Sequence, residues 1–475
     1  MRVKITLNYL VIVMLIITCL IVQPVFAIQN TAIGTAPVTQ TNFLARASAY
    51  PVTPHSIVPE IIEIGKISAS INALGTTASS GTLTIVKPAG ATVRSAYLFA
   101  ATTGFSGYKL ANGDIKIDGT PVTWDIADFP NSINSYNYMG EVTSIVKSTM
   151  DGAPAGDVDF TISEANTGSI DGEILAVIFD DPAQTTDNTV VLLFGAQNVA
   201  GDDFNIGLAQ PIDTSDPNIE LDFSLGISFS YQNQQPPQYS LVNISTNTLT
   251  PQRMTTWAGG NDDGADANGA LITVGGVGDS TANPADPYLS AVNDRRYDDE
   301  LYSLLPFVAD GDTLIKVHTQ NPSDDDNVFF AALELRSATA VVGKGIILSP
   351  ASATNPLNTQ HTLTAKGQDA TGAPIIGQEV TFTITAGPNK GVTGSGITDN
   401  NGEATFSYTG TTAGTDTIIA SFVDTTGTIT SNEATKRWVG EGPIPTPEFP
   451  SIFLPVTMII GFLGAVLLIH RTREY

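Results

Sequence analysis

Residues 219–231 read IELDFSLGISFSY, and this stretch decides the fold class of the chain. Apolar residues occupy every second position, with polar or small residues between them: Ile219, Leu221, Phe223, Leu225, Ile227, Phe229 and Tyr231. Successive side chains of a β-strand point to opposite faces of its sheet, so this period of two predicts a strand with one buried face. An amphipathic helix would space its apolar residues three or four apart.

Further strand signals surround this stretch between residues 56 and 337. Residues 158–162 alternate in the same way, and Asp118-Gly119 separates two short apolar runs as the turn of a tight hairpin would. Segments 174–179 and 190–194 are continuously apolar. Such runs are typical of strands that are covered on both faces.

These patterns predict an all-β head at 56–337, preceded by an extended lead-in at 28–55. We expect a large two-sheet sandwich of jelly-roll or lectin-like shape, with a barrel as the alternative. Residues 139–148 are the best helix candidate. The segment 297–335 is similar to β-domains of uncharacterised methanogen surface proteins, a resemblance that assigns no chemistry.

Residues 340–438 predict a second, smaller β-domain. Alternation recurs at 380–384, 404–408 and 418–422, and Asp399-Asn400-Asn401-Gly402 is a typical turn sequence. About seven short strands in about 100 residues, without a helix candidate, indicate a sandwich of immunoglobulin type.

The motifs of this second domain resemble a known family. The runs QEVTFTITAGPNKG (378–391), ITDNNGEATFSYTGTTAGTDTIIASF (397–422) and ATKRW (434–438) look like the bacterial Ig-like Big-1 domain of invasin-type surface proteins. The resemblance implies a stiff spacer or adhesive module without catalytic residues. We expect Trp438 to pack at one end of the sandwich.

The amino terminus reads as a secretory signal at 1–27. Arg2 and Lys4 precede a run, 10–22, that is almost wholly apolar, and Val25-Phe26-Ala27 fits the residues that signal peptidase reads. We expect cleavage after Ala27; the alternatives are an uncleaved amino-terminal anchor and a lipoprotein site at Cys19.

The carboxyl terminus reads as a membrane anchor. Residues 452–469 carry no charge and are long enough for a transmembrane helix, and the basic tail 470–475 would remain cytoplasmic. Before it, the linker 439–450 contains Pro447, Glu448 and Phe449. This order resembles the PEF-CTERM sorting signal of archaeal surface proteins. The resemblance implies that an archaeosortase-type enzyme recognises the tripeptide and removes the helix; the alternative is a retained anchor.

Composition narrows the function further. The chain has 47 acidic and 21 basic residues, a net charge of −26, so it lacks the basic patches that bind nucleic acid. Its single cysteine, Cys19, lies inside the predicted signal. The mature fold would therefore contain no disulfide.

One loop is a candidate calcium site. Asp262, Asp263, Asp266 and Asn268 concentrate oxygen ligands, which Ca²⁺ prefers, although the spacing is not that of an EF-hand. Solvated turns are the alternative, because Asp, Asn and Gly also form turns. The clusters 298–300 and 324–327 are similar in composition. We expect no other cofactor.

Catalytic signatures are missing: the sequence contains no H-E-x-x-H and no G-x-S-x-G motif. His318 is read as a strand residue. Asn243-Ile244-Ser245 is a glycosylation sequon, and the loop 232–239 with its flanking tyrosines could bind a glycan.

We therefore predict a non-enzymatic protein, anchored at the cell surface through its carboxyl terminus, that serves adhesion or envelope structure through a surface glycan or protein ligand. The alternative is a surface-tethered glycan-binding or glycan-hydrolysing protein, whose two catalytic carboxylates would lie in a cleft of the head.

Overall fold

The computed structural model describes residues 56–75, 78–228, 240–258, 272–274, 301–322, 324, 326–425, 427–440, 462–463 and 465–466. Strands dominate these residues, which confirms the predicted all-β class. The head runs from β1 to β20, and the Ig-like domain from β21 to β29. The predicted helix at 139–148 is partly right, because 136–141 form a strand and α2 (Thr143–Gly152) follows it.

Sheets A and B form the middle of the head. Sheet A has the order β1-β11-β19-β13-β16, with β17 beside β13: β1 (Val58–Gly65), β11 (Asn188–Phe194), β19 (Asn327–Arg336), β13 (Glu220–Ser228), β16 (Ile272–Val274) and β17 (Leu301–Ser303). Sheet B has the order β2-β10-β4-β8-β7: β2 (Ile67–Leu74), β10 (Ile170–Asp180), β4 (Thr92–Thr102), β8 (Tyr136–Glu141) and β7 (Ile126–Pro130).

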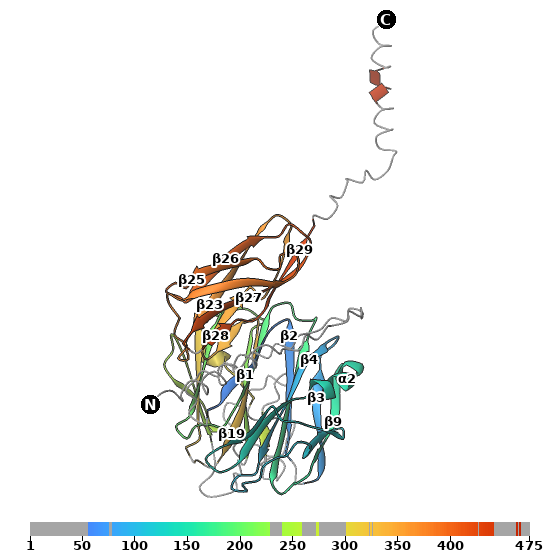
Figure 1. Cartoon of the computed structure of the whole chain (residues 1–475), viewed down its shortest axis with the longest axis vertical. Coiled ribbons are helices and arrows are strands. Elements are labelled where there is room, and N and C mark those ends of the chain that lie inside the picture. The colour runs from blue at the N-terminus through green and yellow to red at the C-terminus, as the bar shows by residue number, and fades with distance from the viewer. Residues whose placement is uncertain are drawn as a thin grey trace, which may run out of the picture. The chain divides into compact units, whose positions relative to one another are not determined.

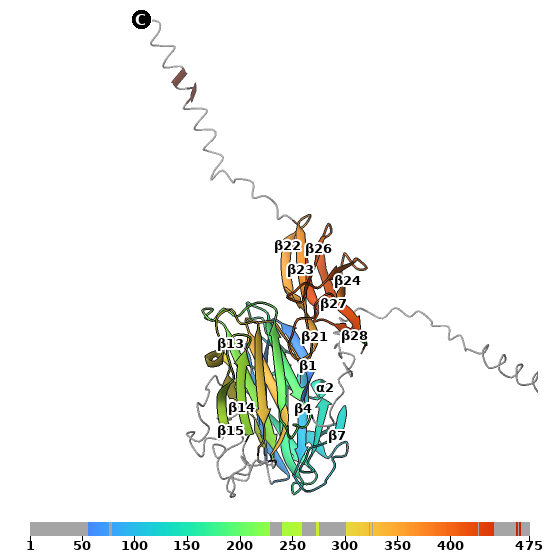
Figure 2. The ribbon, with the colours of Figure 1, turned by 90° about the vertical axis from the view of Figure 1, so that its left-hand side faces the viewer.

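Sheets C and D cover this middle from either side. Sheet C has the order β3-β9-β5-β6: β3 (Ser80–Lys87), β9 (Gly156–Glu164), β5 (Ile115–Ile117) and β6 (Thr120–Pro121). Sheet D has the order β15-β14-β18-β12-β20: β15 (Gln252–Ala258), β14 (Ser240–Thr246), β18 (Leu314–Gln320), β12 (Asp202–Leu208) and β20 (Ala340–Val342). In Figure 2, β14 and β15 lie on one side of the head, and β7 and α2 lie on the other.

The four sheets stack in the order C, B, A, D, with an apolar layer between each neighbouring pair. The head therefore has four sheets, and not the two that we expected. The reason lies in strands that are apolar on both faces. In β10, Leu175 and Val177 pack toward sheet C, whereas Ile174 and Ala176 pack toward sheet A. Sheet A in turn packs its other face on sheet D, for example through Phe223.

The strand that decides the fold class has no solvent face. Residues 220–228 form β13 as predicted, but its polar side chains after Glu220 are also buried, with Asp222 at 4% exposure and Ser224 at 0%. The alternation of apolar residues correctly predicted the strand and the face that packs on sheet D. It could not show that sheet B covers the opposite face.

The predicted hairpin is present. Asp118 and Gly119 connect β5 to β6, and both have positive φ angles, 49° and 78°. A two-residue turn of this kind requires the left-handed region at both positions, which Asp-Gly tolerates. Alongside, α2 packs Val146 and Met150 into the layer between sheets B and C, beside β3, β4 and β9 (Figure 1).

The Ig-like domain is a sandwich of sheets E and F. Sheet E has the order β21-β23-β26: β21 (Gly345–Ser349), β23 (Gln360–Gln368) and β26 (Glu403–Thr409). Sheet F has the order β22-β29-β27-β24-β25, with β28 beside β27: β22 (Ser352–Pro356), β29 (Ala434–Val439), β27 (Gly414–Asp424), β24 (Glu379–Ala386), β25 (Thr393–Ile397) and β28 (Gly427–Thr430). β22 and β29 run parallel; the other paired strands of these two sheets are antiparallel.

Within the described residues, no helix combines the length and the apolar character that a membrane crossing needs. The predicted span 452–469 lies outside those residues, apart from 462–463 and 465–466.

Candidate functional site

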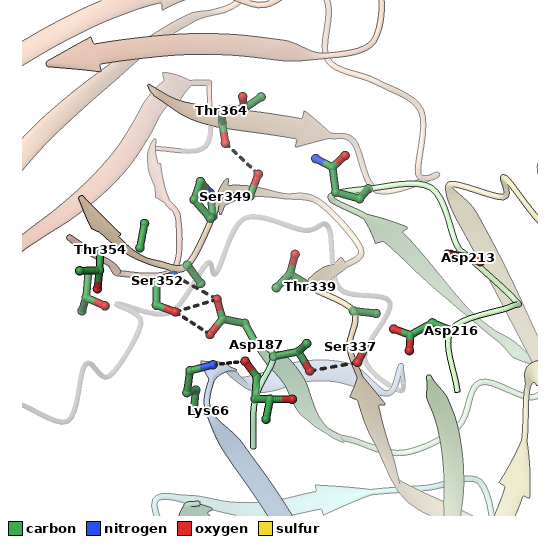
Figure 3. Close-up of a pocket in the computed structure, with 18 of the residues that line it drawn as sticks. Lys66, Asp187, Asp213, Asp216, Ser337, Thr339, Ser349, Ser352, Thr354 and Thr364 are labelled. Atoms are coloured by element: carbon green, nitrogen blue, oxygen red, sulfur yellow. Dashed lines mark hydrogen bonds between the residues drawn. The ribbon is translucent and has the colours of Figure 1, made fainter. Parts of the chain in front are cut away.

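A cleft of about 990 Å³ lies where the head meets the Ig-like domain (Figure 3). Its walls carry many hydroxyl groups from both domains, among them Ser337, Thr339, Ser352 and Thr364. The charged side chains that line it come from both domains: Lys66, Asp187, Asp213, Asp216 and Arg437.

Asp187 closes one side of this cleft. It precedes β11, and its Oδ2 accepts a hydrogen bond from the backbone N of Ser352 at 3.0 Å. Its Oδ1 accepts the hydroxyl of the same serine at 3.1 Å (Figure 3). Hydrogen bonds to an ionised carboxylate are stronger than neutral ones. The head therefore holds β22, the strand that opens sheet F, at its first residue.

A second group of contacts centres on Gln368 at the end of β23. Its Nε2 donates to the carbonyl oxygens of Asn205, Val341 and Gly343, at 3.1, 3.3 and 2.6 Å. A side chain at Gly207 would collide with it, because a Cβ there would lie 1.6 Å from the Gln368 Oε1. The glycine of β12 thus makes room for the amide.

Two further hydrogen bonds cross the same junction. Asn205 Nδ2 donates to the carbonyl of Ala370 at 3.0 Å, and Lys366 Nζ donates to that of Leu208 at 2.8 Å. Because these bonds lie on several strands, bending at the junction would break many of them. The arrangement can transmit force and orientation between the domains.

The cleft does not resemble a sugar-binding platform. Its lining residues include no aromatic side chain on which a sugar ring could stack. Asp213 lies there as an anion, since hydrogen bonds from Ser215 lower the pKa of its carboxyl. The walls carry hydroxyl and charged side chains of both domains.

A pair of buried carboxyls lies elsewhere in the head. Glu164 of β9 and Glu173 of β10 share the strand faces that border the layer between sheets C and B. They are 7% and 0% exposed, and none of their four oxygens has a hydrogen-bond partner. Burial, and secondarily the charge of Asp171, raises the pKa of Glu164 to about 8. Burial and the charge of Glu164 raise that of Glu173 as well.

Burial favours the protonated form of both carboxyls, and the pair does not line the junction cleft. A glycosidase needs its two carboxyls in contact with substrate. The pair is therefore better understood as a source of pH-dependent stability.

Most predicted site residues lie outside the described residues. This applies to Ala27, to the calcium loop Asp262, Asp263, Asp266 and Asn268, and to Pro447, Glu448 and Phe449. Among the residues that the structure does describe, no three His, Cys, Asp or Glu side chains are arranged to hold a metal ion.

Asn243 is described, and it lies half-buried in β14. It pairs with His318 on one side and Arg253 on the other, in a row across sheet D. His318 Nδ1 lies 2.7 Å from the Asp203 Oδ1, so this histidine is a half-exposed strand residue, as predicted. The sequon is thus in a strand and not in a loop.

Sequence reasoning missed a polar cluster at one end of the Ig-like domain. Trp438 packs there as expected, 1% exposed, and its Nε1 donates to Asp416 at 2.8 Å. The same carboxylate accepts the hydroxyl of Tyr408 at 3.1 Å and the Asn389 Nδ2 at 2.7 Å. Lys436 is wholly buried beside them. Lys436 lies two residues before Trp438 in β29, so the period of two places it on the same inner face.

Comparison with known proteins identifies part of the chain. Residues 350–436 match the family described as bacterial Ig-like domain (group 1), which confirms the resemblance seen in the sequence. No curated protein matches the chain in sequence.

Two solved structures show a distant likeness to the chain. A "putative membrane anchored protein" from Corynebacterium diphtheriae is 10% identical, with 82% of this chain and 61% of that chain covered and a TM-score of 0.18. Domains 1–6 of the surface layer protein SbsC are 10% identical, with 82% and 55% covered and a TM-score of 0.16. The chain thus covers less than two thirds of either structure, and these scores carry no argument about the head.

Proposed function

We propose that this protein is exported and held at the cell surface by its carboxyl terminus, with the Ig-like domain as a spacer that carries the head. The observation that carries the proposal is the family match at 350–436, in a body whose sequence outside the predicted signal contains no cysteine. The resemblance to Big-1 domains implies a stiff spacer or an adhesive module, as in invasin-type surface proteins. A fold that does without thiols is compatible with an oxidising exterior.

The two ends of the sequence support export. A basic start, an apolar run and a cleavage site at Ala27 have the order of a secretory signal. At the other end, residues 452–469 have the length and composition of a membrane span. One crossing would leave almost the whole chain outside.

Anchoring is proposed to proceed through Pro447, Glu448 and Phe449. An apolar helix behind this tripeptide would hold it at the membrane surface, within reach of an archaeosortase-type enzyme. Removal of the helix would then leave the protein on another anchor. A retained single helix is the simpler alternative.

The polar contacts at the junction support the spacer role. Hydrogen bonds from Gln368, Lys366 and Asn205 tie the two domains over several strands. A head that is fixed to its spacer presents one surface outward, as adhesion or envelope structure requires. We propose a surface glycan or protein as the ligand, and no catalytic activity.

The test is mass spectrometry of the protein extracted from the cell envelope. We expect the amino-terminal peptide to begin at Ile28 and the carboxyl-terminal peptide to end near Phe449. A carboxyl-terminal peptide that reaches Tyr475 in the envelope fraction would support the retained helix instead. Recovery of the chain from the cytosol with Met1 in place would contradict the proposal.

A further inference from the structure

Lys436 is an unusual residue of the Ig-like domain because its side chain is completely buried. Its Nζ donates to the Asn355 Oδ1 at 2.6 Å and lies 5.1 Å from the centre of the Trp438 ring. Among the described residues, no carboxylate forms an ion pair with it. Burial lowers the pKa of the Lys436 amine, which favours the neutral and nucleophilic form.

The amide of Asn355 is held in one orientation toward this amine. Its Nδ2 donates to the hydroxyl of Thr359 and to the carbonyl of Gln360, both at 3.3 Å. These two acceptors occupy the nitrogen side of the amide. Its oxygen, and with it the carbonyl carbon, therefore faces Lys436.

Asn355, Lys436 and Asp416 lie on three adjacent strands of sheet F. Asn355 pairs with Trp438 in the parallel β22–β29 ladder, and Asp416 pairs with Lys436 in the antiparallel β27–β29 ladder. Paired residues of a ladder share a face. All three side chains therefore project from the inner face of the sheet, and Asp416 is as buried as Lys436, at 0% exposure.

His361 borders the same cluster from sheet E. Burial, followed by the charge of Lys436, lowers the pKa of His361 to about 4, so its imidazole is neutral and adds no competing charge. The Tyr408 and Trp438 rings, 5.5 Å apart, close the cluster. Lys436 itself has no exposed surface, whereas Asn355 is half-buried.

We propose that Lys436 and Asn355 become joined by an isopeptide bond between Nζ and Cγ. Lys436 reacts as its neutral amine. The neutral amine attacks Cγ of Asn355, the Cγ–Nδ2 bond breaks, and the departing nitrogen takes one proton from Nζ and leaves as ammonia. Nothing is oxidised or reduced, and fixed neighbours replace the encounter of two free reactants.

The bond would have a mechanical consequence, which rests on the proposed function. β29 is the last strand of the spacer and leads to the predicted anchor, and β22 is the strand that Asp187 ties to the head. Under tension, a covalent link between the two strands would bear the load that the β22–β29 hydrogen bonds would otherwise bear. It would give a thiol-free domain the kind of crosslink that disulfides give others.

The first experiment is the intact mass of the purified full-length protein after denaturation. We expect a mass about 17 Da below that of the sequence, the mass of one ammonia. Trypsin should then release two joined peptides, 345–366 and 391–437, with Lys436 uncut. A succinimide at an Asn-Gly pair such as Asn401-Gly402 would lower the mass equally, but would join no peptides. The full sequence mass, or a loss without joined peptides, would overturn the proposal.

The variants separate the bond from the fold. Lys436→Arg and Asn355→Ala should each retain the full mass, whereas Lys390→Arg, an exposed lysine of the same domain, should lose ammonia as the parent does. A loss that persists in Lys436→Arg would overturn the bond. The measured masses therefore test the isopeptide bond independently of the proposed location at the cell surface.

Discussion

Raising the pH should lower the free energy of unfolding of the head, because the buried pair Glu164 and Glu173 then tends to ionise. Both side chains are held protonated between sheets C and B, where their oxygens have no donors. In the unfolded chain they ionise at their ordinary pKa. The folded pKa values are raised, so the stabilisation is complete below the unfolded pKa and is lost as the pH rises through the folded one.

The magnitude follows from the pKa of Glu164, which moves from 4.5 to about 8 in the folded head. A change of one in pKa corresponds to about 1.4 kcal/mol, so this group alone can withdraw about 5 kcal/mol as an upper bound. About 3 kcal/mol of that should be lost between pH 4.5 and pH 7. Asp171 and Asp222, with pKa values raised to about 7 by burial, act in the same direction.

The assay is urea denaturation of the parent and its variants from pH 5 to pH 9. Glu164→Gln and Glu173→Gln stay neutral throughout, so the free energy of unfolding should fall less steeply with pH than in the parent. Asp157→Asn, which replaces an exposed carboxylate of β9, should follow the parent. All variants keep Asp171 and Asp222, so the difference in slope isolates the pair. Parallel curves for Glu164→Gln and the parent would refute the reasoning.

Three further predictions concern other parts of the molecule. Asp416→Ala leaves the buried donors of Trp438 and Tyr408 without an acceptor, so denaturation should show a loss of about 3 kcal/mol; an unchanged midpoint would contradict the contacts. Gln368→Ala removes three hydrogen bonds at the junction and should speed proteolysis between the domains while leaving each domain folded. If the loop 262–268 binds calcium, calcium but not magnesium should raise the melting temperature, and Asp263→Asn should abolish that rise.

The sequence predicted strands well where period two was clean. Residues 158–162 and 380–384 became β9 and β24 with alternating burial, and Asp118-Gly119 became the turn. The number of layers was not predictable from the same signal. Ser and Asp at alternate positions of β13 look solvated in a sequence, and only the packing of sheet B on sheet A shows that they are covered.

The candidate site was less predictable than the fold. Gln368 acts at the junction because Gly207, far away in the chain, leaves room for its amide. Lys436 shares the face of Trp438, but a lysine in a strand is usually expected at the surface, and only the packing shows that this one is buried. Contacts between strands that are far apart in the sequence determine the roles of both residues. A single sequence does not reveal those contacts. The signal, the anchor and the calcium loop stay predictions, because their residues lie outside the described ranges.

Surface exposure on living cells tests the central claim most directly. Intact cells should be treated with an amine-reactive reagent that cannot cross membranes, and the protein then isolated and its labelled lysines mapped. We expect label on exposed lysines of the Ig-like domain and the head, such as Lys390 and Lys116, while a cytosolic control protein stays unlabelled. A chain that acquires label only after the cells are broken would contradict the account.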